Sequence, residues 1–187
     1  MAAAETRVEL YYETHCPDSQ HFMKEGLRRS LQLLPEVDFV LVPYGKASTS
    51  GTGPSLSFQC QHGAKECEGN TYHACAIELH SNKKQVLEFA VCTMSFRQNV
   101  LANIEKCAVD NGIDYNAVKN CATGHQGKDF LAKMGELTQA AANKINGRPQ
   151  LDFVPSTIID GTPYVYDSYS NLHKTICANA KQKPCNC

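Results

Sequence analysis

The residue of this chain that is best placed to act as a nucleophile is Cys16. It follows a run, Arg7 to Tyr12, in which apolar residues alternate as in a β-strand, and it precedes Pro17 and a series of apolar residues at helical spacing. Pro17 suits the first position of a helix because its missing N–H would have no partner there. Unpaired N–H groups and the positive end of the helix dipole favour a thiolate at this place. The alternative is a structural disulfide at the end of the strand.

Cys16 begins a Cys-x-x-Ser sequence, Cys16-Pro17-Asp18-Ser19. In the related Cys-x-x-Cys motif, the first thiolate attacks a substrate disulfide and the second thiol resolves the mixed disulfide. Serine forms no S–S bond, so a mixed disulfide at Cys16 needs an outside thiol for its release. We therefore predict Cys16 and Ser19 as the catalytic positions and Pro17 and Asp18 as substrate-facing residues. We predict no bound cofactor, with a small external thiol such as glutathione or free cysteine as the reductant.

Nearby polar residues affect the pKa of Cys16 in both directions. As an imidazolium, His15 would stabilise the thiolate at acidic pH, and its alternative is to point into solvent. The carboxylate of Asp18 would raise the pKa of the thiol, although it also suits the helix dipole. His62, further along the chain, is another candidate, with a structural role as its alternative.

The composition excludes several classes of function. The chain has 187 residues and a formal net charge of −1, which gives no electrostatic attraction for nucleic acid or for an anionic membrane surface. No apolar run approaches the roughly 20 residues of a membrane span. We therefore expect a globular protein without nucleic-acid partners and without a membrane span.

Ten cysteines indicate an oxidising compartment, because reducing systems in the cytosol keep thiols free. We expect a secreted or endosomal/lysosomal protein. No Asn-x-Ser/Thr sequence occurs, so N-glycosylation is not predicted. Residues 1–5 lack the pattern of a secretory signal, which predicts a mature or trimmed form.

The cysteine count also predicts a second free thiol. If Cys16 stays free, nine cysteines remain, and an odd number cannot all pair within one chain. We expect the unpaired thiol in the terminal Cys185-Asn186-Cys187, where it would be available for an intermolecular disulfide. Cys92, Cys107 and Cys121 lie on short predicted helices that bury little surface, so we expect structural disulfides there.

The segment from Cys60 to Cys75 holds three cysteines and two histidines. Its spacing fits no common zinc finger or ribbon, and the oxidising context favours disulfides, so we predict no metal site. As it stands here, Cys-Gln-His-Gly-x-x-x-Cys-x-x-Asn-x-x-x-x-Cys resembles the signature of the gamma-interferon-inducible lysosomal thiol reductase (GILT) family. The resemblance spans nearly the whole chain. Its other elements are Tyr11-Tyr12-Glu13 ahead of Cys16, the later cysteines Cys92, Cys107, Cys121 and Cys177, and Phe153-Val154-Pro155 followed by a hairpin.

The resemblance implies a thioredoxin fold and the reduction of protein disulfides in acidic endosomes and lysosomes, with some members secreted. Thioredoxin-like proteins hold a cis-proline beside the reactive cysteine, so the resemblance implies that Val154 and Pro155 face the substrate. Without it, a proline ahead of a strand is more often trans. Ser19 departs from the usual Cys-x-x-Cys of the family.

The hydrophobic pattern predicts strands that alternate with helices. We expect strands at 7–12 and 37–43, the second buried and parallel, and a hairpin over 154–166 that turns at Asp160-Gly161. A loop is expected at 45–53, and helices are expected from Pro17 to Leu34, at 86–94, at 96–108, after Asp114, at 128–146 and at 168–180. This order predicts an α/β fold with a thioredoxin-like mixed sheet flanked by helices. We expect one domain over 1–187, with a disulfide-rich, mostly helical insertion at 56–126.

Two functions follow from these residues. The first is a GILT-like thiol-disulfide oxidoreductase scaffold that acts on disulfide-containing proteins, with Cys16 as nucleophile and with weak or lost reductase activity because no cysteine resolves. The second is a non-catalytic secreted interaction protein that binds a surface protein partner through the retained fold. A third alternative is that Ser19 is an introduced replacement for cysteine, which the gene sequence would decide.

Overall fold

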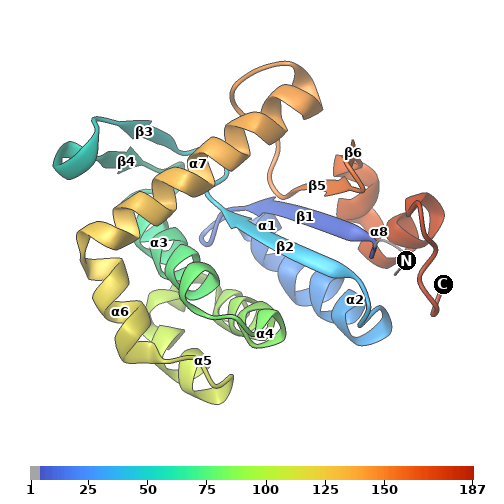
Figure 1. The fold of residues 1–187 in the computed structure, drawn as a ribbon, viewed down its shortest axis with the longest axis horizontal. Coiled ribbons are helices and arrows are strands. Elements are labelled where there is room, and N and C mark those ends of the chain that lie inside the picture. Colours follow the sequence, from blue (N-terminus) through green and yellow to red (C-terminus); the bar gives the residue numbers. More distant parts are fainter. Residues whose placement is uncertain (1–4) are drawn as a thin grey trace.

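A computed structural model describes residues 5–187, so the first residues of the predicted trimmed start lie outside the described chain (Figure 1). Its main sheet has the strand order β2-β1-β5-β6. β1 (Arg7–Tyr12) is parallel to β2 (Asp38–Pro43) and antiparallel to β5 (Ser156–Ile159), which pairs with the short β6 (Thr162–Pro163). The predicted mixed sheet is therefore confirmed.

β1 lies at the centre of the sheet and contributes to hydrophobic cores on both faces. Val8, Leu10 and Tyr12 are fully buried against the helices that follow Cys16, against α4 (Lys83–Met94) and against α8 (Val165–Asn179). On the opposite face, Tyr11 packs in a second core with side chains of α3 (Ala64–Leu79) and α7 (His125–Asn146). The end of β1 is thus held rigidly from both sides, and the chain leaves it directly into the segment that carries Cys16 (Figure 1).

The helix after Cys16 has three parts. α1 (Pro17–His21) leads into a π-helical segment (Phe22–Leu27) and then into α2 (Arg28–Leu33). Pro17 occupies the start of α1, as its missing N–H predicts. The remaining helices are α3 (Ala64–Leu79), α4 (Lys83–Met94), α5 (Ile104–Asp110), α6 (Tyr115–Thr123), α7 (His125–Asn146) and α8 (Val165–Asn179).

All ten cysteines lie within the described residues, and eight of them form four disulfides. The pairs are Cys60–Cys67, Cys75–Cys121, Cys92–Cys107 and Cys177–Cys187. Two thiols are free: that of Cys16, which is buried, and that of Cys185, which is exposed. The predicted structural disulfides of Cys92, Cys107 and Cys121 and the free thiol near the C-terminal end are therefore confirmed.

Several predicted elements are wrong in detail. The expected loop at 45–53 contains a strand, β3 (Ser48–Ser50), which pairs with β4 (Ser57–Gln59) and leads to a 3₁₀ turn (Gly53–Ser55). α3 was not predicted as a helix. The single helix expected at 96–108 is two 3₁₀ turns, at Arg97–Asn99 and Leu101–Asn103, followed by α5, because Arg97 has a positive φ of 50° that interrupts the helix.

The C-terminal hairpin is confirmed at its turn, where Asp160 and Gly161 both have positive φ. Its second strand is shorter than predicted, because β6 has only two residues and α8 already begins at Val165. α8 is bent at Asn171, whose backbone is extended rather than helical. The separation of the chain into one domain and an insertion at 56–126 stays a prediction.

Candidate active site

The structure brings most of the predicted site residues together at the start of α1. Cys16 is the N-cap residue of that helix, and its thiol donates a hydrogen bond to the carbonyl oxygen of Val154 at 3.9 Å. The bond between Val154 and Pro155 is cis, as the resemblance implies. Ser19 is fully buried one turn along the helix, where its Oγ accepts a hydrogen bond from the backbone N–H of Glu13 at 3.3 Å.

The electrostatics of Cys16 differ from the prediction that the helix start favours its thiolate. Burial raises the pKa of Cys16, and the charge of Glu13 raises it further. Hydrogen bonds to the sulfur from the backbone and hydroxyl of Ser19, and from the backbone of Asp18, lower that pKa but do not outweigh burial. The predicted stabilisation is therefore present, yet the resting protein favours the neutral thiol.

Of the two interpretations of His15, the one that points its side chain into solvent is wrong, and the other stays a prediction. The residue is buried, and burial lowers the pKa of its imidazole, which disfavours the charged ring. Its Nδ1 lies 3.3 Å from the hydroxyl of Thr14. The carboxylate of Asp18 accepts a hydrogen bond of 3.0 Å from the hydroxyl of Tyr169.

A buried carboxylate, that of Glu13, lies at the site and was not among the predicted site residues. Its Oε1 accepts a hydrogen bond of 2.7 Å from the backbone N–H of Lys46, and the side chain has no exposed surface. Gly45 permits this packing, since a Cβ there would lie 2.2 Å from Glu13 Cγ, and its φ of +64° also favours glycine. Burial, and then the charge of Glu66, raises the pKa of Glu13 to about 7.

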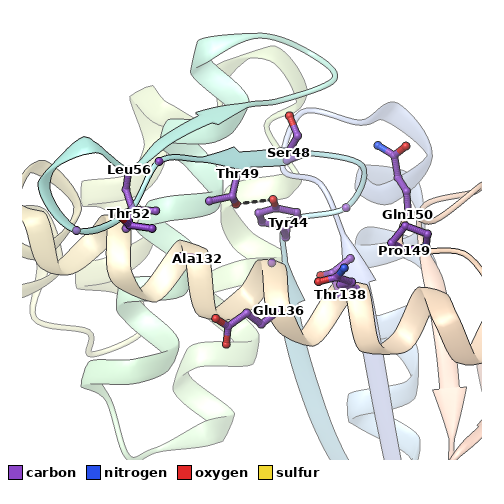
Figure 2. A pocket seen from close by; sticks show the side chains of 16 residues that line it. Tyr44, Ser48, Thr49, Thr52, Leu56, Ala132, Glu136, Thr138, Pro149 and Gln150 are labelled. Carbon is purple, nitrogen blue, oxygen red and sulfur yellow. Dashed lines mark hydrogen bonds between the residues drawn. The ribbon is translucent and has the colours of Figure 1, made fainter.

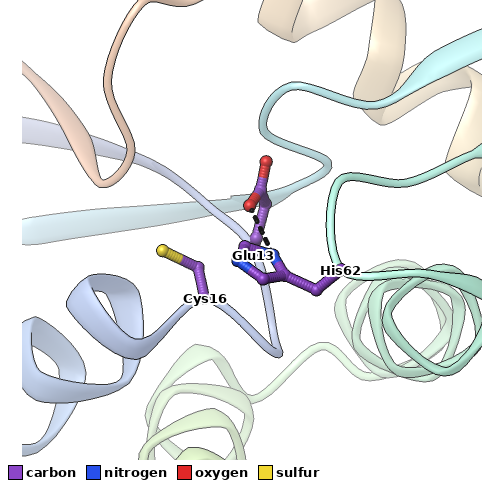
Figure 3. A group of neighbouring side chains, drawn as sticks. All are labelled: Glu13, Cys16 and His62. Atoms are coloured by element: carbon purple, nitrogen blue, oxygen red, sulfur yellow. Dashed lines mark ion pairs between the residues drawn. The ribbon is translucent and has the colours of Figure 1, made fainter.

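His62 links Glu13 to a second buried carboxylate, that of Glu66. Its Nδ1 lies 2.7 Å from Glu66 Oε2 and 3.3 Å from Glu13 Oε2, while its backbone N–H donates to Glu66 Oε1 at 3.0 Å. The Cys60–Cys67 disulfide encloses this segment. Figure 3 shows the His62 ring and the Glu13 carboxylate meeting beside Cys16. One ligand atom of each of these three residues lies within 4.8 Å of the others.

Aromatic side chains form a surface next to the cis-proline segment. Phe153 lies 5.4 Å, between ring centroids, from both Tyr166 and Tyr169. The side chain of Tyr166 is 68% exposed, and the hydroxyl of Tyr169 bonds to Asp18 in the Cys-x-x-Ser sequence. An exposed aromatic surface therefore lies beside the cis-proline segment and is joined to the Cys-x-x-Ser sequence by the bond between Tyr169 and Asp18.

A separate groove of about 620 Å³ lies between the β3–β4 hairpin and α7 (Figure 2). A hydrogen bond of 2.7 Å joins the hydroxyls of Tyr44 and Thr49 inside it, and Glu136 lines its α7 side. Its lining contains no cysteine and no histidine. Thiol chemistry therefore belongs to the Cys16 site and not to this groove.

Comparisons with known proteins agree with this geometry. A family model described as "Gamma interferon inducible lysosomal thiol reductase (GILT)" matches residues 7–111. "GILT-like protein 2" of Drosophila melanogaster is 36% identical over 183 residues, which cover 94% of this chain and 81% of that protein. "Gamma-interferon-inducible lysosomal thiol reductase" of Carassius auratus is 29% identical and covers 99% of this chain and 73% of its own length.

Solved structures with low sequence identity are similar in fold. DsbA of Chlamydia trachomatis has a TM-score of 0.62 at 12% identity and covers 94% of this chain and 88% of its own. A thioredoxin-like oxidoreductase from Silicibacter pomeroyi has a TM-score of 0.53 at 14% identity, covering 95% and 89%. The fold is thus thioredoxin-like, as predicted. Within residues 5–187, no helix is long and apolar enough to cross a membrane.

Proposed function

Because the chain belongs to the gamma interferon inducible lysosomal thiol reductase (GILT) family, we propose that it carries out thiol–disulfide exchange through Cys16 alone. The observation that carries the proposal is the position of Cys16 at the start of α1, beside the carbonyl of Val154 and one turn before a serine. That position offers a sulfur to an extended polypeptide, but no second sulfur within the same turn.

The exchange has two steps. In the first, the Cys16 thiolate attacks one sulfur of a substrate disulfide, forms a mixed disulfide and releases the other substrate sulfur as a thiolate, which takes a proton from solvent. In the second, the thiolate of an external small thiol attacks the mixed disulfide. When the attack falls on the substrate sulfur, Cys16 leaves as a thiolate and the substrate keeps a disulfide to the small thiol. When it falls on the Cys16 sulfur, the substrate leaves as a thiolate and Cys16 keeps that disulfide. In either case a second small thiol reduces the remaining disulfide and is oxidised together with the first.

Turnover is expected to be weak or lost for two physical reasons. The hydroxyl of Ser19 cannot attack the mixed disulfide, so release depends on collision with an external thiol. In addition, burial raises the pKa of Cys16, which lowers the fraction of the reactive thiolate. Hydrogen bonds from Ser19 and Asp18 to the sulfur lower the pKa of Cys16 and so partly offset the effect of burial.

The substrate class and the compartment follow from the same chemistry. We propose that a disulfide-containing protein binds with its backbone along Val154 and Pro155 and with apolar side chains on Tyr166 and its neighbours, while Pro17 and Asp18 contact it from the other side of the sulfur. Four disulfides favour an oxidising location, and the names of several relatives include the word lysosomal. We therefore propose a secreted or endosomal/lysosomal protein.

A second candidate function is partner binding without turnover. The observation that favours it is the combination of Ser19, which removes the resolving thiol, with the exposed aromatic surface at Tyr166. Such a protein would hold a surface protein partner non-covalently, through a long-lived disulfide at Cys16, or through an intermolecular disulfide at the exposed Cys185.

Trapping of the mixed disulfide tests the proposal. A Cys185→Ser variant, which removes the exposed thiol, is incubated with a disulfide-bonded protein and analysed by non-reducing mass spectrometry. We expect a covalent adduct at Cys16 that a small thiol dissolves and that Cys16→Ala abolishes. An adduct that forms equally well with Cys16→Ala, or no adduct at any pH, would refute exchange at Cys16.

A further inference from the structure

We propose that Cys16, Glu13 and His62 form a zinc-binding site at the start of α1. The three residues come from two segments far apart in the sequence, and the fold brings one ligand atom of each within 4.8 Å of the others. Sulfur, carboxylate oxygen and imidazole nitrogen are the three donor types that zinc prefers in proteins. The sequence predicted no metal because the spacing from Cys60 to Cys75 fits no zinc motif. The proposed site takes only His62 from that segment.

The donor atoms of the three residues all lie within 4.8 Å of one another, and a bound zinc ion sets how close they must come. Zinc–ligand bonds of about 2.0 to 2.3 Å place neighbouring donor atoms roughly 3.3 to 3.6 Å apart. The His62 ring already lies against the Glu13 carboxylate, with Nδ1 3.3 Å from Oε2. The Cys16 sulfur lies within 4.8 Å of a ligand atom of each of the other two residues, so zinc binding would draw the three donors closer together.

Glu13 provides the independent observation that points to a cation. Its side chain has no exposed surface, and among residues 5–187 nothing donates a hydrogen bond to Oε2. A buried carboxylate oxygen without a donor is costly. The hydrogen of His62 Nδ1 does not meet this need, because Glu66 Oε2 lies closer to that nitrogen, at 2.7 Å against 3.3 Å. A cation bound to Glu13 Oε2 would satisfy it.

The proposed ligands Glu13 and His62 each make a hydrogen bond to a second group, as zinc ligands usually do. The backbone N–H of Lys46 donates to Glu13 Oε1, which fixes the carboxylate and leaves Oε2 directed at the site. Glu66 Oε2 lies at 2.7 Å from His62 Nδ1, so a neutral ring that donates there carries its lone pair on Nε2. A histidine that donates to a carboxylate through one nitrogen and binds the metal through the other is common in zinc sites.

The charges of the cluster also favour a dication. Glu13 and Glu66 are both fully buried, and the side chain of His62 lies between them. The Cys16 thiol would lose its proton to solvent on binding, so the ligands would present a thiolate and a carboxylate to the metal. The fourth zinc ligand would be water or a substrate thiolate. It would reach the metal from solvent on the side of His62, whose side chain is 32% exposed. Bound zinc would mask the sulfur and make it unavailable for exchange.

Zinc titration of the untagged full chain tests the site directly. The protein carries Cys185→Ser, so that the exposed thiol does not bind metal, and zinc chloride is added in a calorimeter. We expect one zinc per chain. Cys16→Ser and His62→Gln should each lower the affinity by about 100-fold or more, and Glu66→Gln, which removes an outer partner, by about tenfold. Glu13→Gln should also lower the affinity, although its amide keeps the contact with Lys46.

The chain offers a matched control for the histidine. His125 lies 3.0 Å from Asp129 in the same i,i+4 arrangement as His62 and Glu66, but both of its partners are exposed. His125→Gln should leave the zinc affinity unchanged. Affinity that is equal in His62→Gln and in wild type, or the absence of one-to-one binding, would overturn the proposal.

A second measurement keeps the test independent of whether the variants fold. Zinc should protect Cys16 of the unmodified protein from alkylation by iodoacetamide, as read by mass spectrometry, and a chelator should restore the reaction. Alkylation of Cys16 at the same rate with and without saturating zinc would overturn the proposal. Because both readouts concern metal binding, their failure would leave the exchange chemistry of Cys16 untouched.

Discussion

Acidification should weaken this fold through one buried imidazole, that of His73 on α3. The ring is 1% exposed and lies between two hydroxyls, with Nδ1 2.8 Å from Tyr12 Oη and Nε2 2.8 Å from Thr93 Oγ1. The hydroxyl of Thr93 donates to the carbonyl of Ala90, so Nε2–H must donate to Thr93 and Nδ1 must accept from Tyr12. The folded protein therefore holds His73 as one neutral tautomer, and burial lowers its pKa to about 3.

The sign and the size of the effect follow from the difference between the folded and unfolded states. The unfolded chain protonates His73 below its ordinary pKa of about 6.5, whereas the folded chain stays neutral until far lower pH. The unfolded state therefore binds more protons between these values, and stability falls as pH falls. From pH 7 to pH 5 the free energy of unfolding falls by about 2 kcal/mol because of His73, and this decrease is the same for any folded-state pKa below about 4.

Urea unfolding under non-reducing conditions at several pH values measures this loss. Other groups also titrate in this range, so the informative quantity is the difference between wild type and His73→Gln, which cannot ionise. We expect wild type to lose about 2 kcal/mol more than His73→Gln between pH 7 and pH 5. His125→Gln, which changes an exposed histidine, should keep the wild-type pH dependence. Parallel pH dependence in wild type and His73→Gln would refute the reasoning.

Three further predictions concern the framework and the surface. Replacing both Cys75 and Cys121 by alanine removes a disulfide with a sequence separation of 46. This should lower the free energy of unfolding, measured in urea, by about 4 kcal/mol. A decrease of less than about 1 kcal/mol would contradict this prediction. Tyr166→Ala should raise the KM for a protein disulfide roughly threefold to tenfold and leave a small disulfide unaffected, whereas an equal effect on both would place the substrate elsewhere. Gly45→Ala should destabilise the fold by about 1 to 3 kcal/mol more than Gly53→Ala. Both glycines have positive φ, but only at Gly45 would the added Cβ collide with Glu13. Equal decreases in Tm for the two variants would show that the contact between Gly45 and Glu13 is unimportant.

Local patterns predicted the elements whose apolar residues recur at a regular spacing. β1 alternates from Arg7 to Tyr12, and α7 ends at Gly147, which has the positive φ that its role as a helix end requires. A helix was predicted after Asp114, and the side chain of Asp114 caps α6 by accepting a hydrogen bond from the backbone N–H of Ala117 at 3.1 Å. In these cases, the residues that determine the structure are neighbours in the sequence.

The elements that the pattern missed depend on contacts between distant segments. Ser48–Ser50 is polar and exposed, and it is a strand only because it pairs with β4. α3 buries Glu66, Asn70 and His73 where an ordinary helix would bury apolar residues, so its sequence has no apolar stripe. The predicted helix at 96–108 is interrupted at Arg97, whose backbone carbonyl accepts a hydrogen bond from the side chain of the distant Gln20.

The candidate site was predicted where its chemistry is local and missed where it is assembled by folding. Cys16 and Ser19 are recognisable from their spacing and from the helix that follows. Glu13 was overlooked because its burial depends on Gly45 and on His62, which approach it only in the fold. A signal was present in the sequence, since a carboxylate directly after an apolar strand and close to a nucleophilic cysteine is unusual enough to examine.

The most direct test of the central claim is the rate of reduction of a disulfide-bonded protein in the presence of a small thiol, at acidic and at neutral pH. Wild type, Ser19→Cys and Cys16→Ala are compared in a Cys185→Ser background. If Cys16 forms the mixed disulfide and Ser19 limits its resolution, Ser19→Cys should be faster than wild type by on the order of tenfold or more, and Cys16→Ala should be inactive. Equal rates for wild type and Ser19→Cys, or activity that survives Cys16→Ala, would contradict the account.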